Sequence, residues 1–155
     1  MPGIYITQPL KEMKNIIKVG TIKDRDSAIK RLKSLFEKHY YPVGIKDIRK
    51  EKVFNYDKEG NRIKKGHPLY KFLDKKCREF EDMVKVFFKN NTVDIINDAH
   101  LRIVNKDDET LGHFDRSILN NGGSDFLLLN KKQLKQLDIL FDETTGELEK
   151  YIWYW

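Results

Sequence analysis

The chain begins with two short runs of β-type residues, GIYI at 3–6 and IIKVG at 16–20, separated by a polar stretch. Runs of this length and composition predict two strands. The next segment, residues 24–41, has apolar residues at helical spacing and stops before Pro42, which predicts a helix. Asp24, Asp26 or Ser27 can cap its start.

The middle of the chain changes from a loose alternation to a strong helical period. Residues 43–68 alternate loosely around turn-forming residues at 57–61, which predicts one or two strands. Residues 69–90 show the strongest helical pattern in the chain. The predicted apolar side of this helix consists of Leu69, Leu73, Cys77, Phe80, Val84 and Phe87.

The C-terminal part predicts two further strands and a helix. The strands are HLRIVN at 100–105 and DFLLLN at 125–130, and NNGGS at 120–124 is a predicted loop. Asn130 can cap a helix over 131–141, and residues 142–155 predict a turn followed by an aromatic strand. This order of elements predicts the α+β class, with a small antiparallel sheet flanked by helices.

Length and composition favour one globular domain. The 155 residues are 39% hydrophobic and 35% charged, which excludes a disordered composition. We expect a single domain over 1–155, with a core at 3–141 and an aromatic C-terminal extension at 142–155. Cys77 is the only cysteine, which excludes an intrachain disulfide and a thiolate metal cluster. With no signal-peptide pattern and no apolar run of about 18 residues, we expect an intracellular protein, or one packaged in a virion, without a membrane segment.

The charge balance favours a polyanionic partner. A net charge of +6 suits contact with nucleic acid, because phosphate contacts release counterions. Candidate nucleic-acid contacts are Lys23 and Arg25 before the first helix and Lys75 and Lys76 on the second. Lysines on the outer side of a helix also serve solubility alone, and this second interpretation of Lys75 and Lys76 stays open.

Glu81 is the candidate metal ligand. On a helical wheel it lies roughly 80° from the centre of the apolar side, against roughly 120° for Glu79. A carboxylate at that margin can reach a cleft over the sheet and bind a hard cation. Mg²⁺ commonly uses one carboxylate together with water and substrate phosphates, so one glutamate suffices. The alternative is an ordinary solvated helix charge.

The order of several short motifs resembles the GIY-YIG nuclease superfamily, and in particular its short branch in phages and large DNA viruses, whose second motif is KIG. The motifs are GIY at 3–5, KVG at 18–20, an Arg-Leu pair at 31–32, FEDMVKVFF at 80–88, GGSDFLLL at 122–129 and NKKQLKQLDILF at 130–141. The resemblance spans residues 3–141, and it is the order of the motifs that carries it.

The resemblance implies metal-assisted hydrolysis of a phosphodiester. By resemblance, Tyr5 would aid the attacking water, Arg31 would hold the phosphate, and Glu81 would bind one Mg²⁺ or Mn²⁺ ion. Lys18 stands where many members have a second tyrosine, and Gly20 would be the turn glycine of the second motif.

Three departures from the family pattern open a second hypothesis. Because Lys18 stands at the position of the second tyrosine, no residue there can take that tyrosine's role. Asp125 stands where the branch has glutamate before phenylalanine. Arg31 lies further from Gly20 than usual, and Arg25 is its rival. Besides a DNA-binding endonuclease, we therefore expect as an alternative a non-catalytic structural or assembly protein of a virus or phage that retains the fold.

The last five residues, YIWYW, include four aromatic side chains. Tyr151, Trp153 and Trp155 either pack onto the sheet or provide a surface for a protein partner or for self-association.

Overall fold

The computed structural model describes residues 2–10, 13–22, 48–97, 100–114 and 123–155. The helix predicted over 24–41 lies outside these residues, as do Lys23, Arg25 and Arg31. The described helical elements are α2 (Tyr70–Phe87), a short 3₁₀ helix η3 (Lys89–Asn91) and α3 (Lys131–Tyr154). The described strands are β1 (Gly3–Thr7), β2 (Ile16–Ile22), β3 (Ile48–Val53), β4 (Thr92–Asn97), β5 (Leu101–Val104), β6 (Thr110–Phe114) and β7 (Gly123–Leu128).

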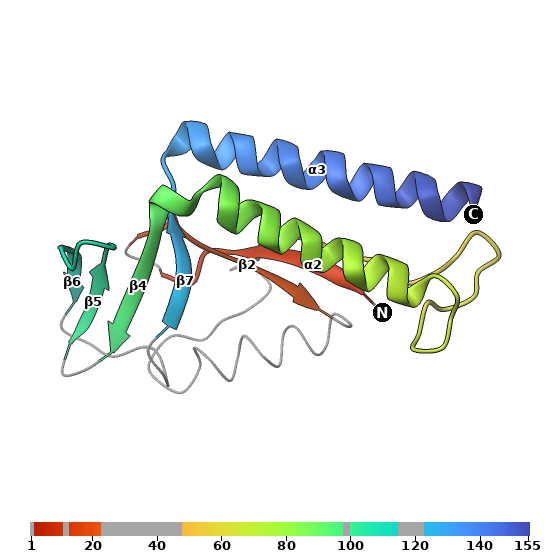
Figure 1. Ribbon diagram of the computed structural model, residues 1–155, viewed down its shortest axis with the longest axis horizontal. Helices are drawn as coiled ribbons and strands as arrows, with labels where there is room; N and C mark the ends of the chain where they lie inside the picture. Colours follow the sequence, from red (N-terminus) through yellow and green to blue (C-terminus); the bar gives the residue numbers. More distant parts are fainter. Residues whose placement is uncertain (1, 11–12, 23–47, 98–99, 115–122) are drawn as a thin grey trace.

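The described strands form one antiparallel sheet in the order β3-β1-β2-β7-β4-β5-β6. Helices α2 and α3 lie side by side over the same face of this sheet (Figure 1). The predicted α+β class is therefore confirmed. Neither of the two described helices is long and apolar enough to cross a membrane.

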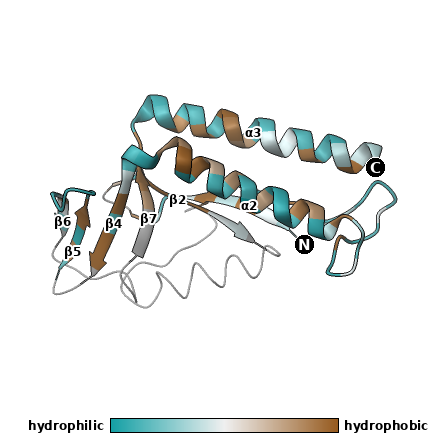
Figure 2. Ribbon diagram, in the orientation of Figure 1, coloured by the Kyte–Doolittle hydropathy of each residue, from teal (hydrophilic) through white to brown (hydrophobic). Residues whose placement is uncertain are grey.

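Hydrophobic side chains form a core on each face of the sheet. On β1, Ile4 and Ile6 point toward the helices, whereas Tyr5 points to the opposite face, because successive side chains of a strand alternate. Figure 2 shows hydrophobic and hydrophilic stretches alternating along α2 and α3, as expected for helices that bury one side. The core beneath the helices includes Ile17, Val19, Leu73, Cys77, Phe80, Val84, Leu137 and Phe141.

The two strands predicted at the start of the chain are confirmed as an antiparallel pair. Tyr5 lies directly opposite Gly20, and Thr7 lies opposite Lys18. On its other side β1 pairs with β3, where Tyr5 lies opposite Glu51. β1 is therefore an inner strand, and the residues around Tyr5 have backbone neighbours on both sides.

The predicted strand in the 43–68 region is confirmed as β3, and the turn after it is also confirmed. The backbone N–H of Asp57 donates to the carbonyl of Asn61 at 2.9 Å, and Gly60 at φ +84° supplies the left-handed turn conformation. The predicted strands at 100–105 and 125–130 correspond to β5 and β7, whereas β4 and β6 have no counterpart among the predicted strands.

One residue of the predicted apolar side of α2 was assigned wrongly. Phe87 is exposed, and Phe88 is buried in its place. α2 ends at Phe87, and Phe88 is its C-cap residue. Phe88 also follows the buried Val84 by four residues, so it continues the apolar side that leads from Leu73.

The prediction of a turn and an aromatic strand at 142–155 was wrong, because α3 continues without a break to Tyr154. Its predicted cap is confirmed: the Asn130 side chain accepts a hydrogen bond from the Gln133 N–H at 2.9 Å, and the Gln133 side-chain oxygen accepts one from the Asn130 N–H at 3.0 Å. The helix continues because Leu148 and Ile152 extend the buried side begun by Leu137 and Phe141 at helical spacing.

Ion pairs align α3 with β3. Arg49 forms a two-point contact with Asp138, at 3.0 and 2.6 Å, and Lys50 contacts Asp142 at 2.8 Å. A third pair joins Lys52 to Glu149 in the part of α3 that the sequence prediction placed in a strand. These pairs join β3 to α3 from Asp138 to Glu149 along the helix.

Candidate functional site

A pocket of about 350 Å³ opens between β2 and α2. It is lined by Tyr5, Lys18, Val19, Gly20, Thr21, Arg78, Glu81 and Asp82. The structure therefore brings together three side chains that were proposed from sequence, Tyr5, Lys18 and Glu81, from three separate elements. The fourth predicted catalytic residue, Arg31, lies outside the described residues.

The pocket exists because β2 extends beyond its pairing with β7. β1 pairs with β2 from Lys18 to Ile22, whereas β7 pairs only with Ile16 and Ile17. Figure 1 shows β2 running away from β7 beneath α2. Among the described strands, none pairs with residues 18–22 of β2 on the side away from β1. A side chain from α2 can therefore meet side chains from the opposite face of the sheet at this edge.

Gly20 places the Tyr5 ring. The two residues are cross-strand partners, and a Cβ atom at Gly20 would lie less than 3.0 Å from two ring carbons and the hydroxyl oxygen of Tyr5. Contacts this short do not occur at real Cβ atoms, so the phenol can lie across the β2 backbone only because residue 20 has no side chain. The ring itself is almost fully buried, while the residue still lines the pocket.

Lys18 adds a cation to the same side of β2. It is two residues from Gly20, so both lie on the face of the sheet that carries Tyr5. The Lys18 ammonium lies 5.1 Å from the centre of the Phe126 ring, which is the geometry of a cation–π contact. This contact favours a Lys18 position beside the pocket, where an ammonium group can attract a phosphate oxygen.

Helix α2 contributes the acidic residues. The Glu81 side chain is 23% exposed and pairs with Lys85 at 3.3 Å. Glu79 is 48% exposed, contacts Lys76 at 3.2 Å, and does not line this pocket. The helical-wheel prediction that Glu81 lies nearer the apolar side than Glu79 agrees with these positions. Asp82, the next residue, brings a second carboxylate into the pocket.

Two charged lining residues, Arg78 and Asp82, are not among the residues proposed from sequence. Arg78 precedes Glu81 by three residues and Asp82 by four, so all three share one side of α2. Arg78 is exposed and contacts Asp74 at 3.3 Å. The spacing of Arg78 to Glu81 and Asp82 is the sequence signal that could have identified it. Among the described residues, Arg78 is the arginine that lines the pocket.

Lys75 and Lys76, predicted as nucleic-acid contacts, do not line this pocket. Lys75 is exposed and lies 3.9 Å from Glu79. Lys76 lies over the Phe72 ring at 5.6 Å and lines a separate groove between α2 and α3. Any contact of these lysines with DNA would therefore be made outside the pocket.

The oxygen donors of the pocket fit a hard divalent cation. Glu81 and Asp82 offer carboxylate oxygens, which Mg²⁺ and Mn²⁺ prefer as protein ligands. Among the described residues, no group of three or more His, Cys, Asp or Glu side chains converges as a metal cluster. A cation held here would complete its coordination with water and with oxygens of the substrate, as is usual for Mg²⁺.

Cys77 lies close in sequence to the pocket residues but has no chemical role in it. The thiol is fully buried in the core beneath the helices. Burial, together with the nearby charge of Asp74, raises the pKa of Cys77 to about 12. The thiolate form is therefore scarce near neutral pH, and nucleophilic chemistry by this cysteine is disfavoured.

Comparison with known proteins does not extend this description: no protein-family model, curated protein or solved structure matches the chain.

Proposed function

We propose that this pocket is the active site of a metal-dependent endonuclease that binds DNA and hydrolyses a phosphodiester. The observation that carries the proposal is the meeting of Tyr5, Lys18 and Glu81 in one pocket between β2 and α2. A phenol, a cation and a carboxylate are the groups needed to orient water, hold a phosphate and hold a metal ion. The arrangement also supports our proposal that the chain is related to the GIY-YIG nucleases, which its motifs resemble.

Each side chain has a distinct part in the proposed reaction. The Tyr5 oxygen positions the attacking water by accepting a hydrogen bond from it, and as the water oxygen bonds to phosphorus the water loses one proton to bulk solvent. The phosphorus–oxygen bond to the leaving strand breaks, and that oxygen takes a proton from solvent. Lys18 and Arg78 offset the negative charge of the phosphate. Glu81, with Asp82, would hold Mg²⁺ or Mn²⁺, which when bound polarises the phosphate and stabilises the leaving oxygen.

A nicking assay on supercoiled plasmid tests this function. Wild-type protein with Mg²⁺ or Mn²⁺ is expected to convert supercoiled DNA to the relaxed form, and EDTA is expected to stop the conversion. Circular dichroism on the same preparation establishes that the protein is folded. A folded protein that cleaves neither plasmid nor single-stranded DNA with either metal would contradict the proposed activity.

A non-catalytic assembly protein is the second candidate. The observation that favours it is the apolar surface of α2 that faces away from the core, where Val86 and Phe87 are both exposed. In such a protein the loss of the Glu81 charge would leave function unchanged, whereas polar substitution of Phe87 would weaken association. For both candidate functions we propose an intracellular or virion location.

A further inference from the structure

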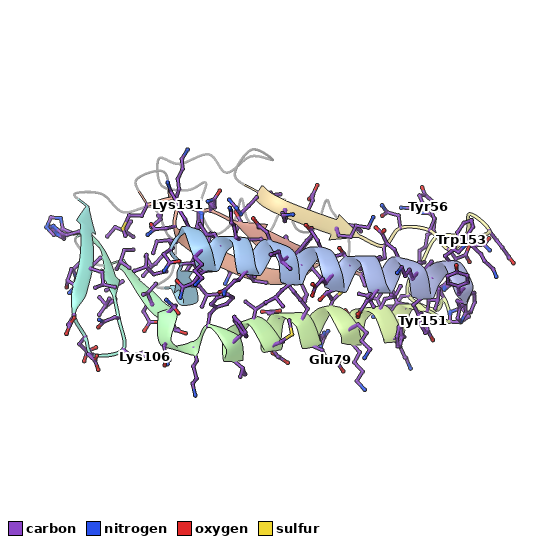
Figure 3. The ribbon with its side chains drawn as sticks, turned by 90° about the horizontal axis from the view of Figure 1, so that it is seen from above. Tyr56, Glu79, Lys106, Lys131, Tyr151 and Trp153 are labelled. Atoms are coloured by element: carbon purple, nitrogen blue, oxygen red, sulfur yellow. The ribbon has the colours of Figure 1, made fainter. Side chains whose placement is uncertain are left out.

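A second pocket, of about 390 Å³, lies at the other edge of this part of the sheet, between the segment that follows β3 and the last turns of α3. Its floor contains the buried side chains of Phe54 and Ile152. Its walls include two exposed aromatic side chains, Tyr56 and Trp153. Figure 3 shows these two residues at the same end of the molecule, near the end of α3.

The two aromatic side chains are unusually accessible for their size. Tyr56 is 56% exposed and Trp153 is 65% exposed, although each has a large apolar ring. Two other aromatic side chains of this helix end have ring partners: Tyr151 stacks on Phe72 at 4.1 Å, and Trp155 lies 5.6 Å from the His67 ring. Tyr56 and Trp153 instead border a cavity large enough for a planar ring to enter.

The segment that carries Tyr56 is held in place by hydrogen bonds. Asp57 accepts the backbone N–H groups of Glu59 and Asn61, both at 2.9 Å, and its second oxygen lies 2.9 Å from His67 Nε2. Because His67 Nδ1 accepts the N–H of Leu69 at 3.0 Å, the Nε2 atom carries the hydrogen and donates it to Asp57. This bond, with the two backbone bonds, lowers the pKa of Asp57 to about 2 despite its burial. The wall of the pocket is thus ordered before any ligand binds.

The charge around the pocket suits an anionic strand. Residues 58–65 carry Lys58, Arg62, Lys64 and Lys65, all exposed, against one glutamate, a net charge of +3. Two of the described acidic residues line the pocket. Glu149 is paired with Lys52, and the Asp57 carboxylate accepts hydrogen bonds from the backbone of the turn that follows it. The lining also includes the exposed amide of Asn55, which can both donate and accept hydrogen bonds at the edge of a base.

We propose that this pocket binds an unpaired nucleobase of a single-stranded nucleic acid, stacked against Trp153 and Tyr56, with the basic residues of 58–65 next to the phosphates. Aromatic side chains bind bases of any sequence because every base has a π-face, and lysines follow the backbone. In a duplex the base faces are covered by their neighbours, so the pocket selects single strands. The inference is independent of the proposed cleavage, since binding is measured in EDTA.

Tryptophan fluorescence provides the test. Trp153 and Trp155 are the two tryptophans of the chain, so Trp155→Phe leaves Trp153 as a single reporter. Titration with an oligo-dT of about 12 nucleotides is expected to quench this emission, and added salt is expected to weaken the binding. Trp153→Ala is expected to raise the Kd for the oligonucleotide, measured by anisotropy of a labelled strand, roughly tenfold.

Tyr154→Ala is the matched control, because Tyr154 is the neighbouring aromatic residue, is 81% exposed, and does not line the pocket. It is expected to leave the Kd unchanged. Equal losses in Trp153→Ala and Tyr154→Ala, or emission that oligo-dT does not quench, would overturn the proposal. Dimers that form without nucleic acid and are lost in Trp153→Ala, together with unquenched emission, would instead assign the surface to self-association.

Discussion

Replacing Glu81 by glutamine is expected to slow metal-dependent cleavage by about 10²–10³-fold. The substitution keeps the shape of the side chain but removes the charge that would hold the cation in the pocket beside Tyr5 and Lys18. The ion pair with Lys85 is lost as well, which as an i,i+4 pair is worth only about 0.3–0.5 kcal/mol. Single-turnover nicking rates and thermal unfolding of the same samples measure both effects.

Glu79→Gln is the control for this experiment. It makes the same chemical change two residues away on α2, at a side chain that contacts Lys76 and lies outside the pocket. We expect its cleavage rate to equal that of the wild type. Equal losses in the two variants, or none in Glu81→Gln while the wild type cleaves, would mean that the reaction takes place elsewhere.

Gly20→Ala is expected to lower the free energy of unfolding by about 1–3 kcal/mol and to lower the cleavage rate at the same time. The added methyl group would occupy space taken by the Tyr5 ring, which is packed in the core on that face of the sheet and cannot move without cost. Urea denaturation measures the stability, and nicking by the folded fraction measures the activity.

Gly146→Ala is the control, and it is expected to change the free energy of unfolding in the opposite direction. Gly146 lies within α3, and a Cβ atom there would meet no atom within 4 Å. Alanine has the higher helix propensity, so this variant is expected to gain up to about 1 kcal/mol. A Gly20→Ala variant as stable as the wild type would contradict the close approach of Tyr5 to the β2 backbone.

The fold follows from the sequence wherever local patterns decide the structure. The β-type runs of β1 and β2, the apolar side of α2 and the Asn130 cap are local features, and the structure confirms them except at Phe87. The extent of α3 is different, because the stretch around Thr144, Thr145 and Gly146 has weak helix propensity. Packing of Leu148 and Ile152 and the pair between Lys52 and Glu149 hold it as helix, and these contacts are made with residues distant in sequence.

The remaining strands illustrate the same limit. β4 has polar residues among its apolar ones, and its pairing with β7 and β5 determines its conformation. β6 is short and begins beside the polar turn at 105–109, and it gains its strand character from β5. On β4 the buried Val93 and Ile95 alternate with Thr92 and Asp94, a period of two that could have identified the strand, whereas the described side chains of β6 have no such alternation of buried residues.

The candidate site is likewise predictable from the sequence only in part. Strand alternation puts Tyr5, Lys18 and Gly20 on one face, and the helical period puts Glu81 at the margin of the buried side of α2. Their meeting depends on β7 leaving β2 after Ile17, which no local pattern encodes. Arg78 and Asp82 become candidates only once it is known that none of the described strands pairs with residues 18–22 on that side of β2.

A manganese titration followed by nuclear magnetic resonance locates the cation directly. Paramagnetic Mn²⁺ broadens the signals of nearby nuclei, so isotope-labelled protein reports the binding position residue by residue. We predict that the backbone signals of Gly20, Glu81 and Asp82 broaden first and that Glu81→Gln prevents this. Broadening that begins at the exposed acidic turn of Asp107, Asp108 and Glu109, or that is unchanged in Glu81→Gln, would contradict a metal site between β2 and α2.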